Sequence, residues 1–279
     1  MGDNTKSTVY SDNINNAGAA VRSADMNIAK SGHRRVHMID TIRGVIILGV
    51  VAYHFLFDLW DIWDMDLWWM QSVLVNGIRD FGAGVLIFLS GISSLLSHSN
   101  IKRGFKTLVC ALILSLVTYF AVPDNFIFWG ILHFLGFMML IYGIIGKFIN
   151  KLPRLVGFGI FMALFVFMYP LVIDGYVGLL GLFKIYIPEA MKVSELTYII
   201  GFGGGELISA DYFPILPWSA LFLAGTYVGN YVKEGRIPEF LYKDVCKPIT
   251  FLGRNTLVIY LLHQPVIFAL VWLVYKIFV

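Results

Sequence analysis

Residues 43–58 read RGVIILGVVAYHFLFD, an apolar run with an arginine at one end and a histidine and an aspartate at the other. The run is long enough for a helix that crosses a lipid bilayer. At ~100° per residue, four polar side chains fall within a face roughly 60° wide. They are Asp40, Arg43, His54 and Asp58. One face of this predicted span is therefore polar from end to end, while the rest is aliphatic or aromatic.

The composition of the whole chain agrees with a membrane location. Of its 279 residues, 58% are hydrophobic and 14% are charged, and its mean hydropathy is +0.76. These values lie well outside the usage of soluble globular domains. The formal net charge of +3 is small, and the basic residues fall in short clusters, which argues against a nucleic-acid-binding surface.

Hydropathy predicts an all-α fold, a polytopic transmembrane helix bundle of about seven spans with the amino terminus in the cytoplasm. Residues 1–34 are polar and low in aromatics, which predicts a disordered cytosolic tail, so residues 35–279 form the transmembrane domain. The expected spans are 41–58, 75–97, 105–122, 127–147, 155–173, 213–232 and 255–278. The external segment 174–212 contains an apolar stretch that we interpret as an interfacial or re-entrant piece.

The charges sort to two sides of these spans, and the positive-inside bias places the basic side in the cytoplasm. The basic side carries Arg34, Arg35, Lys102, Arg103, Lys106, Lys147, Lys151, Arg154, Lys233, Arg236, Lys243, Lys247 and Arg254. The opposite side carries Asp61, Asp64, Asp66, Asp124, Asp174, Glu189, Glu195, Glu206 and Asp211, with few lysines or arginines.

The first span carries the candidate chemistry. Arg43 lies eleven residues before His54, ~16 Å along a helix axis, so Arg43 is expected near the cytoplasmic interface and His54 in the outer half. Asp58 follows His54 by four residues, where its carboxylate can hold the imidazole as a general base. Ionisable residues inside a membrane are costly and indicate function. The alternatives are that Arg43 anchors the helix by pairing with Asp40, and that His54 and Asp58 form a structural pair.

Two further histidines are expected at membrane depth. His133 lies in the outer half of the 127–147 span, where it is either functional or a structurally satisfied histidine. His263 lies near the middle of the last span, and Pro265 should kink that helix and free backbone carbonyls beside a cavity. A metal site that joins these two histidines to His54 is a minor alternative, because no close ligand spacing is present. We predict no bound metal.

Five blocks of the chain resemble a known family. They are HMIDTIRGVIILGVVAYHFLFDL, IFLSGISSLL, FWGILHFLGF, DYFPILPWSALFLAGTYVG and LGRNTLVIYLLHQPVI. In this order they resemble the bacterial heparan-alpha-glucosaminide N-acetyltransferase-like catalytic domain proteins, over nearly all of the chain from about residue 35. The spacing from Arg43 to His54 also resembles the first-helix signature of a broader superfamily of membrane acyltransferases that modify surface polysaccharides.

The resemblance implies acyl transfer from cytosolic acetyl-CoA to an amine or hydroxyl on the outer side. His54 would be the general base, oriented by Asp58, and His133 would stabilise the oxyanion. A double-displacement route through an acetyl-histidine is equally compatible with the sequence. Guanidinium groups suit the phosphates of the donor, and we assign donor binding to Arg43, Arg254, Asp40 and His263. Acceptor binding is assigned to Asp211 and Trp218.

The expected partners are acyl-CoA, an extracytoplasmic glycan or amino-sugar acceptor and the lipid bilayer, with no nucleic acid and with a homo-oligomer as an open alternative. The expected location is the inner membrane of a bacterium. A small proton-coupled transporter or flippase would use the same histidine and aspartate as a relay, although no paired broken helices mark two symmetric halves. A scaffold without chemistry would leave the pairing of His54 with Asp58 unexplained.

Overall fold

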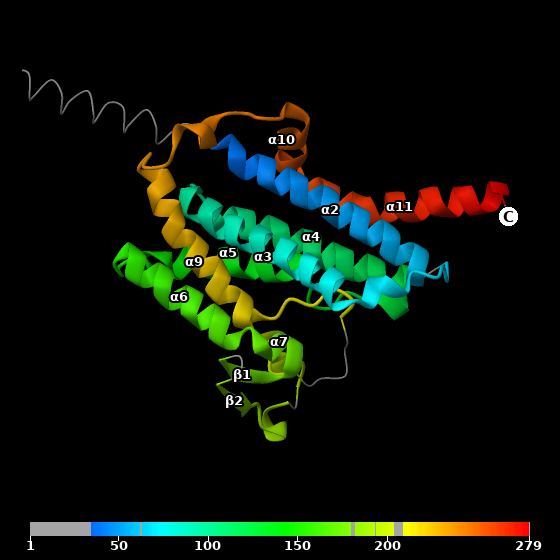
Figure 1. The fold of residues 1–279 in the computed structure, drawn as a ribbon, viewed down its shortest axis with the longest axis horizontal. Helices are drawn as coiled ribbons and strands as arrows, with labels where there is room; N and C mark the ends of the chain where they lie inside the picture. The colour runs from blue at the N-terminus through cyan, green and yellow to red at the C-terminus, as the bar shows by residue number, and fades with distance from the viewer. Residues whose placement is uncertain (1–34, 62, 180–181, 193, 204–208, 279) are drawn as a thin grey trace, which may run out of the picture.

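The computed structural model describes residues 35–61, 63–179, 182–192, 194–203 and 209–278, so the expected tail 1–34 lies outside the described residues. Most of the described chain is helical (Figure 1). The long helices are α2 (His37–Asp61), α3 (Val73–Leu96), α4 (Asn100–Ala121), α5 (Ile131–Ile149), α6 (Arg154–Met168), α9 (Ile215–Lys233) and α11 (Thr256–Phe278). The short helices are α7 (Pro170–Asp174), α8 (Glu195–Ile200) and α10 (Lys247–Arg254).

Six helical segments in the described part of the chain are long and apolar enough to cross a membrane. They are α2, α3, α4, α5, the segment Arg154–Asp174 that contains α6 and α7, and residues Thr256–Val274 of α11. The expected span 213–232 does form a helix, α9, but α9 is not among these six. The polytopic helix bundle is confirmed, and the direction of its amino terminus stays a prediction.

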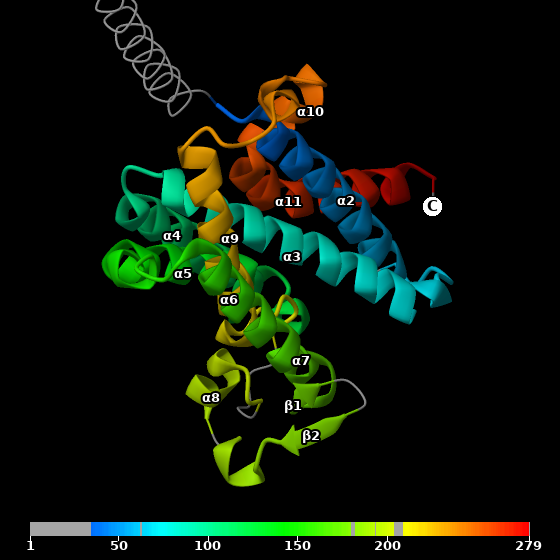
Figure 2. The same ribbon diagram turned by 60° about the vertical axis from the view of Figure 1, so that its left-hand side comes forward.

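Helix α9 lies inside the bundle, where α3 and α6 both pack against it (Figure 2). Gly91 of α3 and Gly225 of α9 meet at the crossing of their helices. A Cβ atom on Gly91 would collide with the carbonyl oxygen of Phe222, and one on Gly225 would collide with that of Phe88. Small residues therefore let the two backbones touch.

Helices α10 and α11 pack against α2 (Figure 1). The backbone of α10 crosses α2 closely, because a Cβ atom on Gly253 would collide with the carbonyl oxygen of Asp40. The hydroxyls of Thr41 and Thr250 lie 2.9 Å apart across the same crossing. This contact brings the end of α10, and with it Arg254, beside the start of α2.

The segment after α7, expected as an interfacial or re-entrant piece, forms a hairpin, and its place relative to the membrane stays a prediction. Strands β1 (Tyr176–Leu179) and β2 (Phe183–Tyr186) form an antiparallel hairpin in which Tyr176 pairs with Tyr186. Gly175, with φ of 70°, ends α7 in the left-handed conformation that favours glycine. Aromatic and β-branched residues then favour strands over another helix. The hairpin and α8 lie beyond the ends of α6 and α9 (Figure 2).

The basic segments of the sequence gather at one end of the bundle. One cavity is lined by residues from the starts of α2 and α4 and from the ends of α3 and α9. At the start of α6, Arg154 forms a bidentate pair with Glu234, which directly follows α9. We expect this end of the bundle in the cytoplasm. The described fold therefore brings together basic residues that the positive-inside bias assigns to one side of the membrane.

Candidate functional site

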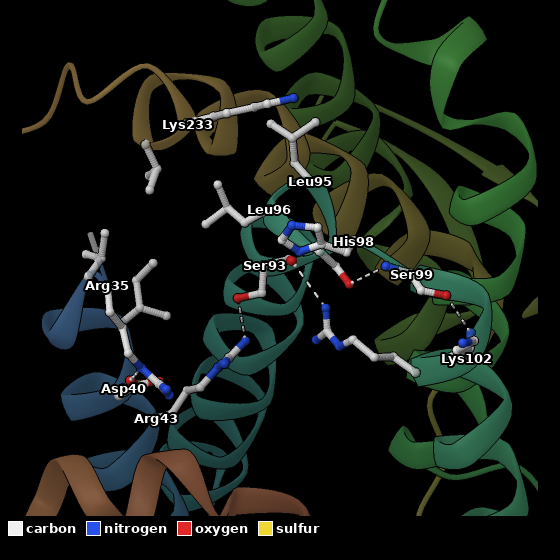
Figure 3. A pocket seen from close by; sticks show the side chains of 15 residues that line it. Arg35, Asp40, Arg43, Ser93, Leu95, Leu96, His98, Ser99, Lys102 and Lys233 are labelled. Carbon is white, nitrogen blue, oxygen red and sulfur yellow. Dashed lines mark hydrogen bonds and ion pairs between the residues drawn. The ribbon is translucent and has the colours of Figure 1, made fainter. Parts of the chain in front are cut away.

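A basic cavity of about 840 Å³ opens at this end of the bundle (Figure 3). Arg35, Asp40 and Arg43 approach it from the start of α2, while Lys233 projects from α9. The complete lining is Arg35, Val36, Ile39, Asp40, Arg43, Ser93, Leu95, Leu96, Ser97, His98, Ser99, Lys102, Arg103, Val232 and Lys233. Five lysines and arginines thus face one carboxylate, so the cavity carries an excess of positive charge.

Two of the arginines meet at the end of α3. Arg43 donates from Nη2 to the carbonyl oxygen of Leu89 at 3.1 Å and to Oγ of Ser93 at 2.9 Å. Arg103 donates from Nη1 to the carbonyl oxygen of Ser93 at 3.2 Å. Carbonyl groups at the carboxyl end of a helix attract cations, which explains why two like charges are tolerated here. A guanidinium has five N–H donors, so both groups keep donors for a ligand.

The single carboxylate of the cavity is already used within the fold. Asp40 is 5% exposed and accepts a hydrogen bond from Nε of Arg35 at 2.7 Å. Nε of Arg254 lies 3.6 Å from the same carboxylate oxygen, and Nη2 of Arg254 donates to Nδ1 of His37 at 2.9 Å. The expected donor-binding residues Asp40 and Arg254 therefore lie together, with Asp40 positioning the two arginines.

A pair of histidines lies farther along the polar face of α2. The rings of His54 and His263 are 4.9 Å apart between centroids. Nδ1 of His263 lies 2.7 Å from the carbonyl oxygen of Tyr260. A carbonyl can only accept, so Nδ1 carries the proton and Nε2 has a free lone pair. His263 is 8% exposed, and among the described residues its Nε2 has no hydrogen-bond partner.

Asp58 lies beside this pair but bonds across to α11. Its Oδ1 accepts a hydrogen bond from Nε2 of Gln264 at 2.6 Å, while its Oδ2 has no partner in the described part of the chain. Asp58 is 1% exposed. The expected bond between Asp58 and His54 is therefore not formed. The structure instead links Asp58 to the residue that follows His263, so α2 and α11 hold each other at the level of the histidine pair.

His133 caps the start of α5. Its Nδ1 accepts a hydrogen bond from the backbone N–H of Gly130 at 3.3 Å, and its Nε2 lies 3.1 Å from Oγ of Ser115. Both ring nitrogens are thus engaged within the fold. A role for His133 as an oxyanion donor stays a prediction, and it would require one of these bonds to break.

Both expected acceptor residues are held within the fold. Oδ2 of Asp211 accepts hydrogen bonds from the backbone N–H of Ile131 and from the hydroxyl of Tyr260, each at 3.0 Å. Burial raises the pKa of the Asp211 carboxyl. Through its two hydrogen bonds, Asp211 connects the start of α5 to α11, the helix that carries His263. Trp218 is 2% exposed and belongs to the aromatic core.

One ion pair of the site was missed by the sequence reasoning. Arg79 of α3 donates from Nε to Oδ1 of Asp80 at 2.9 Å, and it also interacts with the Tyr53 hydroxyl. Arg79 lies within electrostatic reach of His54 and Asp211. Two adjacent charges within an apolar span are a signal of function in themselves, and that signal was available in the sequence.

A comparison with protein-family models gives one match. The family described as heparan-alpha-glucosaminide N-acetyltransferase, catalytic, matches residues 35–265. This range includes the basic cavity, the histidine pair and the Arg79–Asp80 pair. The comparisons with curated proteins and with solved structures find no match.

Proposed function

We infer that this chain, which belongs to the heparan-alpha-glucosaminide N-acetyltransferase catalytic family, is a membrane acetyltransferase that uses acetyl-CoA. The acetyl group would pass to an amine or hydroxyl of an extracytoplasmic sugar or glycan. The observation that carries this proposal is the basic cavity, because the acyl donor of such a reaction is a polyanion.

The cavity suits the phosphates of coenzyme A. Its five lysines and arginines exceed its one carboxylate, and that carboxylate, Asp40, is already paired with Arg35. Arg43 and Arg103 add planar groups that match phosphate oxygens with two parallel hydrogen bonds. The volume of about 840 Å³ lies within the range of ligand pockets. We propose that this end of the bundle faces the cytoplasm, where acetyl-CoA is made.

The reacting carbonyl would lie at the histidine pair. His54 is eleven residues from Arg43, ~16 Å along α2, so the acyl arm of the donor would run from the cavity along the polar face of this helix. Val36, which directly precedes α2, and Ile39 of α2 line the basic cavity where that path begins. We propose a bacterial inner membrane as the location.

We propose His54 as the general base. It would take the proton of the acceptor nitrogen or oxygen while that atom forms a bond to the acyl carbon. The carbon–sulfur bond then breaks, and His54 returns that proton to the sulfur, so coenzyme A leaves as its thiol. His263, with a free lone pair on Nε2, is the nearby group that could carry the acetyl group in a double displacement. Asp58 and Gln264 would hold α2 and α11 in register for either route.

The test uses purified full-length protein in detergent and compares His54→Ala with Arg43→Gln. Acetyl-CoA binding is measured by calorimetry, and thiol release by a colorimetric reagent. We expect His54→Ala to bind acetyl-CoA but to release no thiol above background, and Arg43→Gln to bind it at least tenfold more weakly. Lys106→Gln is the matched control, since Lys106 is exposed and does not line the cavity. A folded wild type that fails to bind acetyl-CoA would refute the proposal and favour a proton-coupled transporter.

A further inference from the structure

A second cavity, of about 410 Å³, lies in the opposite half of the bundle. It is a groove between α3 and α6, which both pack on α9, and its floor includes Trp218 and Leu221 of α9. On the α3 side the groove extends from Gly77 to Phe88. These twelve residues span ~16 Å, about half of the ~30 Å hydrocarbon thickness of a bilayer. The groove is therefore about as long as one leaflet is thick.

The groove has an apolar body and one polar end. Phe88, Phe158 and Phe165 line its body, whereas its polar end holds the carboxylate of Asp80 and the hydroxyl of Tyr169. These two groups interact electrostatically with each other. The polar end lies near the start of α3, at the level that we assign to the outer membrane interface. Polarity along the groove thus follows polarity across a leaflet.

The side of the groove is open toward the membrane. Phe81, which lines it, is 75% exposed, and Ile78 beside it is 64% exposed. In a bilayer these side chains face lipid, so a molecule can enter sideways without leaving the hydrocarbon. A water-soluble sugar does not reach this opening, because the opening faces hydrocarbon. A molecule with a hydrocarbon chain in the outer leaflet does reach it.

The polar end of the groove and His54 share a charged neighbour, Arg79. Asp80 is bonded to Arg79, and Arg79 in turn interacts with Tyr53 and lies within electrostatic reach of His54. The groove residues of α3 lie on a different face from Gly82 and Ser93, which face α2. A head group held at Asp80 would therefore reach the proposed base around the outer end of α3, past Arg79. Sugar hydroxyls can donate hydrogen bonds to the Asp80 carboxylate beside its bond from Arg79, which leaves the amine free to react.

We propose that the acetyl acceptor is an amphiphile, an amino sugar or similar amine carried on a hydrocarbon chain, whose chain lies in the groove between α3 and α6. This inference rests on the proposed acetyltransferase function and names its acceptor class. The head group meets Asp80 at the outer end of the groove, and the chain extends inward past Phe81 and Phe165.

The test compares two acceptors that differ in their chain alone, the methyl and octyl glycosides of glucosamine. Transfer of radiolabelled acetyl from acetyl-CoA is measured with the purified full-length protein in detergent. Gly77→Leu fills the outer part of the groove, and an added Cβ atom there meets nothing within 4 Å. Gly159→Leu is the matched control, because Gly159 also has open space around it but does not line the groove. Micelles concentrate the octyl acceptor equally for every variant.

We expect the wild type and Gly159→Leu to prefer the octyl acceptor in kcat/KM, and Gly77→Leu to lose about tenfold or more of that preference. A leucine at position 77 excludes several methylenes of the octyl chain from the groove, so their packing contacts with its walls are lost. Phe81→Ala, which shortens an exposed wall, should lower the preference with the methyl acceptor unaffected.

An unchanged preference in both groove variants would overturn the inference, as would a wild type that acetylates both acceptors equally well. If no thiol is released with either acceptor and acetyl-CoA does not bind, the proposed function itself is refuted. These readouts separate failure of the acceptor inference from failure of the proposed function.

Discussion

The most direct prediction concerns Arg103, which is bonded to the fold at one point and lines the basic cavity. Arg103→Gln removes a charge and the guanidinium donors while leaving Arg43 in place. We expect the acetyl-CoA affinity to fall and the thermal stability in detergent to change little, because the side chain contributes one hydrogen bond to a carbonyl of α3.

The size of the effect follows from the contacts that Arg103 can offer. Hydrogen bonds to charged groups contribute about 1.5–3 kcal/mol each. Loss of one such bond to phosphate therefore weakens binding by about 10- to 150-fold, because each 1.4 kcal/mol is a factor of ten in the dissociation constant. The assay is calorimetric titration with acetyl-CoA and with dephospho-coenzyme A at low and moderate salt.

The control is Lys106→Gln, one turn farther along α4, exposed and outside the cavity. It removes the same charge, but only the long-range attraction is lost, which salt screens. We expect less than a threefold change at moderate salt. Equal losses for the two variants, or no loss for Arg103→Gln, would refute the assignment of phosphate binding to this cavity.

Three further predictions concern stability. Gly225→Ala should lower the unfolding free energy by about 1–3 kcal/mol, because its Cβ atom would collide with the carbonyl oxygen of Phe88; thermal unfolding in detergent measures this. The raised pKa of Asp211 means that the folded protein binds more protons than the unfolded chain, so stability should fall as pH rises through this pKa, and Asp211→Asn should remove that slope. Gln264→Leu should cost about 1–3 kcal/mol by leaving the buried Asp58 carboxylate without its donor, as measured by the same unfolding assay.

Each of these predictions has its own contrary result. Gly159→Ala, at a helical glycine with open space, should be neutral or stabilising, so an equal loss there would remove the steric explanation for Gly225. A pH slope that survives in Asp211→Asn would mean that another group produces it. The double variant Asp58→Leu with Gln264→Leu should recover stability, and failure to recover would show that the bond itself is not what matters.

The sequence predicts the long helices well, because each must present some 20 apolar residues to lipid. The expected span 213–232 corresponds to α9 (Ile215–Lys233). The hairpin was not predicted, because its residues are as apolar as those of a helix and the deciding feature is the left-handed turn at Gly175. Apolar content alone does not separate a short strand from a short helix.

The site was predicted in part for a similar physical reason. A helical face can be read from one sequence, so the sequence places Arg43 and His54 on one side of α2. Contacts between helices cannot be read that way. Asp58 was paired with its neighbour on the same helix, whereas its hydrogen bond comes from Gln264, 206 residues away. The position of Arg103 in the basic cavity and the groove between α3 and α6 also depend on contacts between helices that are far apart in the sequence.

Helix α9 also has a consequence for how the protein is made. It is not among the helices of the described chain that are apolar enough to cross a membrane by themselves, and Thr226 and Asn230 add polar groups to it. Helices α3 and α6, which precede α9 in the chain, pack against its buried face. We therefore expect the entry of α9 into the bilayer to be a folding step assisted by α3 and α6, which the ribosome delivers first.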